Sequence, residues 1–108
     1  MQAGKLDRRV TIERATMADD GFGQTPTWAE LATVWASRRD VSDAERFASG
    51  EVSAQITTRF RIRWSSVVAG IDPRDRLICE GRTYDIAAVK EIGRREGLEI
   101  TAAARADR

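Results

Sequence analysis

The sequence predicts a mainly β protein, a small antiparallel β-barrel of six strands with one short α-helix in a loop. The clearest observation is the segment 54–64, in which every second side chain is apolar or small and the intervening ones are polar. A period of two places these sets on opposite faces of a strand, which no helix can do. Two hairpin signals, at 80–81 and 93–97, follow late in the chain. The length of 108 residues suits a single domain, 1–108, and favours a small barrel over a two-sheet sandwich.

The first half of the chain predicts two strands. Residues 6–15 place Leu6, Val10 and Ile12 on one face and form the first strand. The Asp- and Gly-rich segment 18–24 is typical of a turn-rich loop. Residues 31–39 contain β-branched and aromatic side chains and form the second strand, although alanines blur which of its faces is inside.

An insertion interrupts the strands at 40–53. Ser42 and Glu45 have the spacing of a capping box, which predicts a helix from Asp43 to Ser49 that Gly50 closes. A helix of two turns is not stable alone. We therefore expect it to pack on the barrel or to be ordered by a neighbouring subunit.

The second half of the chain predicts four more strands. After the long strand 54–64, a loop at 70–75 has Pro73 at a position suited to a type I turn. Residues 76–79 and 82–92 flank the two-residue hairpin 80–81, and a change of parity predicts a bulge near 87–88. The last strand follows the 93–97 loop, with alternating apolar side chains at Leu98, Ile100, Ala102 and Ala104. The tail 105–108 is expected to fray.

Composition excludes most catalytic chemistry. The chain has no histidine and one cysteine, Cys79, so neither a zinc site nor His-dependent nucleophilic catalysis is expected. Cys79 sits in an apolar alternation and is expected to be a buried structural thiol. The acidic residues sit at turns and at a helix start. We expect no enzyme, no cofactor and no metal.

Charge and targeting signals limit the partners and the location. A net charge of +1 argues against a general nucleic-acid binder. The N-terminal residues contain no apolar core of a signal peptide, and no segment is long and apolar enough to span a membrane. The protein is therefore expected to remain in the cytoplasm in which it is made.

One surface feature is a row of arginines on the polar face of the long strand, Arg59, Arg61 and Arg63, hereafter the arginine row. It has two interpretations of equal weight: a solvated face balanced by cross-strand acids, or a contact surface for an acidic neighbour. Direct DNA binding ranks third, because no aromatic residues interleave on that face. The three tryptophans, Trp28, Trp35 and Trp64, are expected in the core.

The insertion 40–53 is the second candidate. Between residues 40 and 51 the charged residues are Asp40, Asp43, Glu45 and Glu51 against Arg46 alone. The segment is either a simple crossover between strands or a loop that projects from a rigid barrel.

An ordered set of short motifs resembles the bacteriophage head–tail joining family, whose members are also called head-closure or stopper proteins. It begins with Gly-x-Leu-Asp-Arg-Arg-Val-x-Ile at 4–12 and Asp-Gly-x-Gly at 20–23, which leads to Trp28. Val-Trp-Ala at 34–36, the acidic insertion and Arg-Ile-Arg-Trp at 61–64 follow. Ile-x-Pro-x-Asp-Arg at 71–76 and Gly-Arg-x-Tyr-x-Ile-x-x-Val at 81–89 complete the set.

The resemblance implies a small β-barrel that assembles as a homo-oligomeric ring, expected to be a dodecamer, in the virion of a phage or phage-like particle. The ring would lie below the portal and adaptor rings, close the channel after packaging, dock a tail component and let double-stranded DNA pass without sequence-specific binding. The family's plug is a loop that projects into the channel, and the matching positions are 40–53. The expected channel-facing residues are Asp40, Ser42, Asp43, Glu45, Arg46, Phe47 and Glu51.

Two alternatives remain open. A small nucleic-acid-binding barrel of the OB or SH3-like kind would act through the arginine row and show steeply salt-dependent affinity. A tail-terminator-type virion protein would share the strand content. In the head-closure interpretation the arginine row could face a neighbouring subunit or an acidic ring surface.

Overall fold

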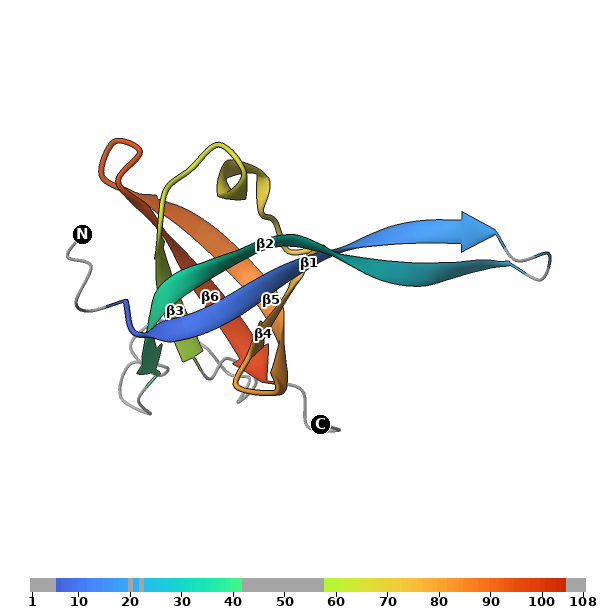
Figure 1. The fold of residues 1–108 in the computed structure, drawn as a ribbon, viewed down its shortest axis with the longest axis horizontal. Helices are drawn as coiled ribbons and strands as arrows, with labels where there is room; N and C mark the ends of the chain where they lie inside the picture. The colour runs from blue at the N-terminus through green and yellow to red at the C-terminus, as the bar shows by residue number, and fades with distance from the viewer. Residues whose placement is uncertain (1–5, 20, 22, 42–57, 105–108) are drawn as a thin grey trace.

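A computed structural model describes residues 6–19, 21, 23–41 and 58–104. Its strands are β1 (Arg8–Asp19), β2 (Gln24–Asp40), β3 (Thr58–Arg63), β4 (Arg76–Cys79), β5 (Arg82–Ile92) and β6 (Gly97–Ala104). They close into an antiparallel barrel in the order β1-β2-β3-β6-β5-β4 (Figure 1). The predicted fold class is confirmed. The helix predicted at 43–49 and the tail 105–108 lie outside the described residues.

Alternation in β3 places one set of side chains in the core, as the sequence predicts. Thr58, Phe60 and Ile62 are buried, and the arginines between them point outward. The strand ends at Arg63, which pairs with the first residue of β6, Gly97. The prediction that the strand continues through Trp64 is wrong: the Trp64 N–H still donates to the Glu96 carbonyl at 3.2 Å, but Glu96 belongs to the turn before β6 and not to the strand. Residues 54–57 lie outside the described residues.

The barrel interior is a continuous apolar cluster to which every strand contributes. Phe60 and Tyr84 meet edge to face within it, with ring centroids 5.1 Å apart. Ile12, Ile62 and Ile100 are fully buried. Burying one such side chain contributes about 1.5–3 kcal/mol. Val10, Ile12 and Leu6 are buried, as predicted for the first strand.

The strands β1 and β2 are longer than the sequence predicts. They run beyond the barrel as a two-stranded ribbon that extends along the longest axis of the molecule (Figure 1). The pairs from Arg14↔Ala29 to Asp19↔Gln24 bind only each other within the described sheet. We call residues 14–19 and 24–29 the arm. The loop predicted at 18–24 is therefore shorter, and Pro26 and Trp28 lie in a strand.

Pro26 is compatible with the arm because both arm strands are edges. Proline cannot donate to a ladder, so it is tolerated where its backbone nitrogen faces outward. Pro26 lies opposite Met17. The sequence predicts a loop over part of the arm, 18–24, because the Asp and Gly residues there are typical of turns.

A bulge and an ion pair mark the base of the arm. Ile12 pairs with Ala32 and Glu13 pairs with Glu30, so Leu31 is the extra residue. A bulge bends its strand and increases the local twist. Just beyond it, Arg14 reaches the loop before β4, where it binds the fully buried carboxylate of Asp75 (Nε–Oδ1 2.9 Å, Nη2–Oδ2 3.0 Å).

The same loop contains features that the sequence analysis predicts in part. A 3₁₀ turn at Val68–Gly70 is not predicted. The turn around Pro73 is confirmed, with the Asp75 N–H donating to the Asp72 carbonyl at 3.0 Å. Arg14 Nη2 also donates to the Gly70 carbonyl at 2.7 Å. The loop is therefore tied to β1 by both its backbone and Asp75.

The late hairpins agree with the sequence. Glu80 and Gly81 both have positive φ, 52° and 81°, as a two-residue hairpin of type I′ requires. The bulge in β5 lies between Ile86 and Ala88, as predicted. The strand β6 starts at Gly97, so the loop predicted at 93–97 is one residue shorter.

The tryptophans depart from the prediction. Trp35 is 52% exposed, because its neighbour Ala36 takes the inward position of β2. Trp28 and Trp64 are half-buried. Each indole has an arginine near its ring, at 5.0 Å for Arg9 and Trp35. The expectation of three core tryptophans is wrong for Trp35 and for Trp28, which lie outside the core cluster, whereas Trp64 packs against it.

Replacing Arg14 should weaken the fold. Arg14→Ala leaves the Asp75 carboxylate buried without its cation, which costs about 1–3 kcal/mol. Arg74→Ala on the same loop is the control, because Arg74 is largely exposed and its partner Asp72 can be solvated. Urea unfolding should show a lower midpoint for the first variant only; equal midpoints would contradict this assignment.

Cys79 should react slowly in the folded protein. The side chain is buried as predicted, and burial together with the Glu80 charge raises the pKa of its thiol. The reactive thiolate is therefore scarce near neutral pH. A thiol reagent at pH 8 should modify the protein far more slowly than it modifies urea-unfolded chains. Equal rates would show that the β4 end of the barrel opens readily.

Candidate functional site

The arginine row lies on the outer face of β3, and its three members differ in their partners. Arg61 Nε binds Glu99 Oε2 of β6 at 3.0 Å, and Arg59 Nη1 lies 3.7 Å from Glu99 Oε1. Arg61 and Glu99 are direct cross-strand neighbours. Opposite Arg63 stands Gly97, which has no side chain to offer. Cross-strand balance therefore accounts for Arg59 and Arg61 and not for Arg63.

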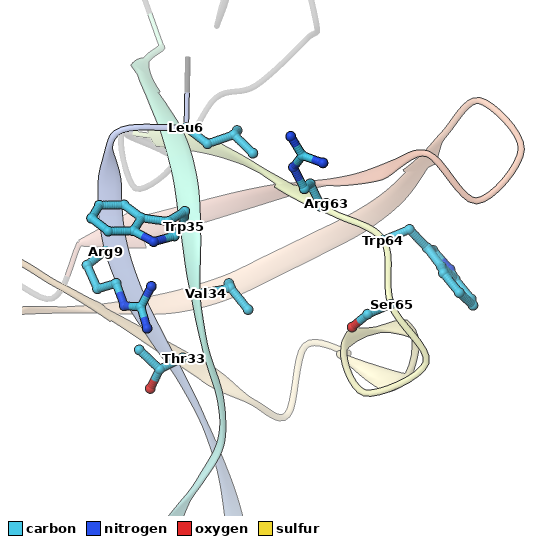
Figure 2. A pocket seen from close by; sticks show the side chains of 8 residues that line it. All are labelled: Leu6, Arg9, Thr33, Val34, Trp35, Arg63, Trp64 and Ser65. Atoms are coloured by element: carbon cyan, nitrogen blue, oxygen red, sulfur yellow. The ribbon is translucent and has the colours of Figure 1, made fainter. Parts of the chain in front are cut away.

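Arg63 belongs to a different surface, an open groove of about 690 Å³ beside the barrel wall. Its apolar lining comes from Leu6, Val34, Trp35 and Trp64. Figure 2 shows that β1 and β2 form one side, and that the end of β3 with the residues after it forms the other. We call this surface the wall groove.

Two exposed cations border the wall groove. Arg9 lies over the exposed Trp35 ring, and Arg63 comes from the end of β3. Neither forms an ion pair within the part of the chain that the structure describes. The groove thus combines an apolar floor with two positive charges that are available to an acidic partner.

The arm presents a second apolar surface. Directly opposed side chains of an antiparallel pair share a face. The pairs Ala15↔Trp28 and Met17↔Pro26 place four apolar side chains on one face, hereafter the apolar face of the arm. Met17 is 54% exposed. The other face includes the pair Thr16↔Thr27, both exposed.

Trp28 is fixed at the base of this face. The Arg76 guanidinium lies 4.1 Å from the Trp28 ring centroid, and Arg76 Nε donates to Glu13 Oε1 at 2.7 Å. Because a guanidinium is planar and rigid, it loses little conformational entropy for each contact when it binds a carboxylate and stacks on an indole at the same time. The apolar face is therefore held in a defined orientation where it joins the barrel.

The described residues on either side of 42–57 lie at one end of the barrel. Asp40 and Thr58 are Cα partners in the β2–β3 ladder, and Val41 is buried. Arg38 Nε lies 3.5 Å from Asp40 Oδ1 and its Nη1 binds Glu80. Of the expected channel-facing residues the structure describes Asp40 alone; the others, Ser42, Asp43, Glu45, Arg46, Phe47 and Glu51, lie outside the described residues.

Within residues 6–19, 21, 23–41 and 58–104, no three His, Cys, Asp or Glu side chains gather as a metal site would require. No helix in the same residues has the length and apolarity needed to cross a bilayer.

Comparison with known proteins identifies the family. Residues 1–105 match the family of phage head completion proteins. The chain belongs to this family. Membership confirms the resemblance seen in the sequence and makes the chain a virion protein of phages or phage-like particles. The arrangement of strands above is thus that of a head completion protein.

Two solved structures are similar to the chain. The solution structure of a protein from Shigella flexneri 2a superposes with a TM-score of 0.80 and 30% identity, covering 100% of both chains. A chain from the virion of a native gene transfer agent particle has a TM-score of 0.65 and 26% identity, covering 93% of this chain and 96% of that one. No curated protein matches the chain.

Sequence reasoning missed the wall groove and the apolar face of the arm. A signal for the arm exists in the sequence, since apolar residues alternate at 15 and 17 and again at 26 and 28 around glycines 21 and 23. The wall groove has no such signal, because its residues come from positions 6–9, 33–35 and 63–65.

Proposed function

We propose that this head completion protein forms a ring in the head–tail connector that closes the DNA exit channel after packaging and docks the tail. The proposal rests on the family match over residues 1–105 together with the closed barrel. A closed barrel supplies a rigid body that can repeat around a channel. The dodecameric ring, with portal or adaptor above and tail below, follows from the family resemblance.

We assign channel closure to residues 40–53. Asp40 of β2 and Thr58 of β3 are partners at one barrel end, so a loop that joins them starts and ends at a fixed base. Its sequence carries four acidic residues against one arginine. In a ring the negative charges of all subunits would add, repel phosphates and discourage sticking while DNA slides. Double-stranded DNA would then pass without sequence-specific binding.

The geometry makes a nucleic-acid-binding barrel the weaker proposal. Such a barrel would use the arginine row, but Glu99 engages two of its three members. The proposed structural role in a connector ring, which involves no catalysis, does not require a row of unpaired arginines. A tail-terminator role shares the ring and the barrel, and the position of the protein within purified particles separates it from head closure.

Deleting residues 43–50 tests the closure assignment. Since Asp40 and Thr58 are adjacent partners, the remaining residues can still join β2 to β3. We expect the variant to enter particles while packaged DNA becomes accessible to nuclease. A variant with an eight-residue Gly-Ser replacement controls for chain length. Particles that keep their DNA protected in the deletion variant would refute the assignment to 40–53.

Changing the arginine row to alanine tests its contact role. The triple variant Arg59→Ala, Arg61→Ala, Arg63→Ala should reduce the protein's incorporation into particles, measured against the capsid protein. Among the single variants we expect Arg63→Ala to have the largest effect, because Arg61 already has Glu99 as its partner. Unchanged incorporation of the triple variant would assign the row to a solvated face.

A further inference from the structure

We propose that the arm of one subunit binds in the wall groove of the next subunit, so that each ring contact joins two different surfaces of the same chain. The proposal rests on the ring assigned above and names the contact that builds it. The occupant of the groove is therefore a second copy of this chain. Four observations support the pairing.

The first observation is the incomplete burial of the arm. An isolated two-stranded hairpin is at best marginally stable in water. The arm pairs with no third strand of the described sheet, and the cation–π contact of Arg76 covers only its base at Trp28. Met17, opposite Pro26, is left 54% exposed. A partner that covers this face would complete the packing.

The second observation is the match in chemistry. The wall groove is apolar at its floor and is the size of a binding cleft, with Trp35 52% exposed. Aromatic side chains that remain exposed beside an apolar groove are typical anchors of interfaces. The apolar face of the arm is two strands wide and presents Met17 and Pro26, whose apolar side chains match the apolar floor of the groove.

The third observation is charge. Between residues 15 and 29 of the sequence the charged residues are Asp19 and Asp20. The wall groove carries Arg9 and Arg63, neither of which has an ion-pair partner among the described residues. Asp19 ends the first arm strand and Asp20 follows it in the sequence, so this part of the chain is opposite in charge to a groove with two arginines, which favours encounter.

The fourth observation is geometry. The wall groove is lined by Arg9 of β1 and by Thr33, Val34 and Trp35 of β2, the same strands that continue into the arm. A ribbon cannot fold back onto its own base without breaking its ladder. The arm spans six residues per strand, about 20 Å at the usual strand rise. It can therefore reach a neighbour but not the groove of its own chain.

A contact between two different surfaces is heterologous, and it closes into a ring when the rotation between subunits divides a full turn. A contact of the arm with another arm would be isologous and would stop at a dimer. The arm-in-groove contact is thus the kind that a connector ring requires.

Cross-linking in assembled particles tests the contact. The double variant Met17→Cys, Ser65→Cys places one thiol on the arm and one at the rim of the wall groove. Treated with a short bismaleimide and denatured, it should give a ladder of covalent oligomers beyond the dimer. Met17→Cys alone and Ser65→Cys alone should remain monomeric, and Cys79 is buried in all of them.

A matched control and two substitutions complete the test. Met17→Cys combined with Lys90→Cys, an exposed position on β5, should give no ladder. Met17→Asp should reduce incorporation into particles at least ten-fold, whereas Thr16→Asp on the opposite face of the arm should leave it unchanged. Neither change should shift the unfolding midpoint of the isolated chain, because both positions are exposed.

The outcomes separate this inference from the proposed function. A ladder that stops at the dimer, a cross-link of Met17→Cys with itself, or equal effects of both aspartate variants would overturn the arm-in-groove contact. If particles contain the protein at the head–tail junction and retain DNA while no ladder forms, the ring proposal stands and the contact is wrong. Absence of the protein from that junction would overturn both.

Discussion

Unequal strand length is the constraint on which the rest of this structure depends. The strands β3 and β4 span six and four residues, whereas β1 and β2 span 12 and 17. Closure of the barrel uses only the part of β1 and β2 that finds a partner in β3 or β4. The remaining residues, 14–19 of β1 and 24–29 of β2, have no partner in the described barrel wall and extend beyond it as the arm. The bulge at Leu31 and the Arg14–Asp75 pair then fix where the arm begins and where it points.

Within the described residues, several arginines on the outer surface of the barrel form ion pairs with carboxylates of the same chain, and others do not. Glu99 engages Arg59 and Arg61, Glu80 engages Arg8 and Arg38, and Asp75 engages Arg14. The exposed pairs among these, those of Glu80, contribute little to stability, about 0–1 kcal/mol each, but an arginine that binds a carboxylate of its own chain is less available to a partner. Arg9 and Arg63 are left beside an apolar groove. That combination of charge and apolar area is what distinguishes the wall groove from the remainder of the barrel surface.

The two proposed roles, channel closure and contact between subunits, are assigned to different regions of the chain. The barrel end that holds Asp40 and Thr58 anchors the region assigned to channel closure. The arm lies at the opposite end of β2 from that ladder end (Figure 1), and the arm and the wall groove are assigned to contacts between subunits. The proposed ring contacts and the proposed channel closure therefore involve different residues of the chain.

The sequence by itself determined the barrel, because a period of two and local turn chemistry are properties of neighbouring residues. The alternation at 58–63, the Glu80-Gly81 hairpin and the bulge near Ala87 all follow from such patterns. Family motifs in the same order pointed to the head completion proteins, which the family match confirms. The tertiary structure decided what depends on distant residues: the length of β1 and β2, the exposure of Trp35, the split of the arginine row by Glu99 and the wall groove. Each of these features depends on contacts between strands that are distant in the sequence, and no pattern of neighbouring residues contains that information.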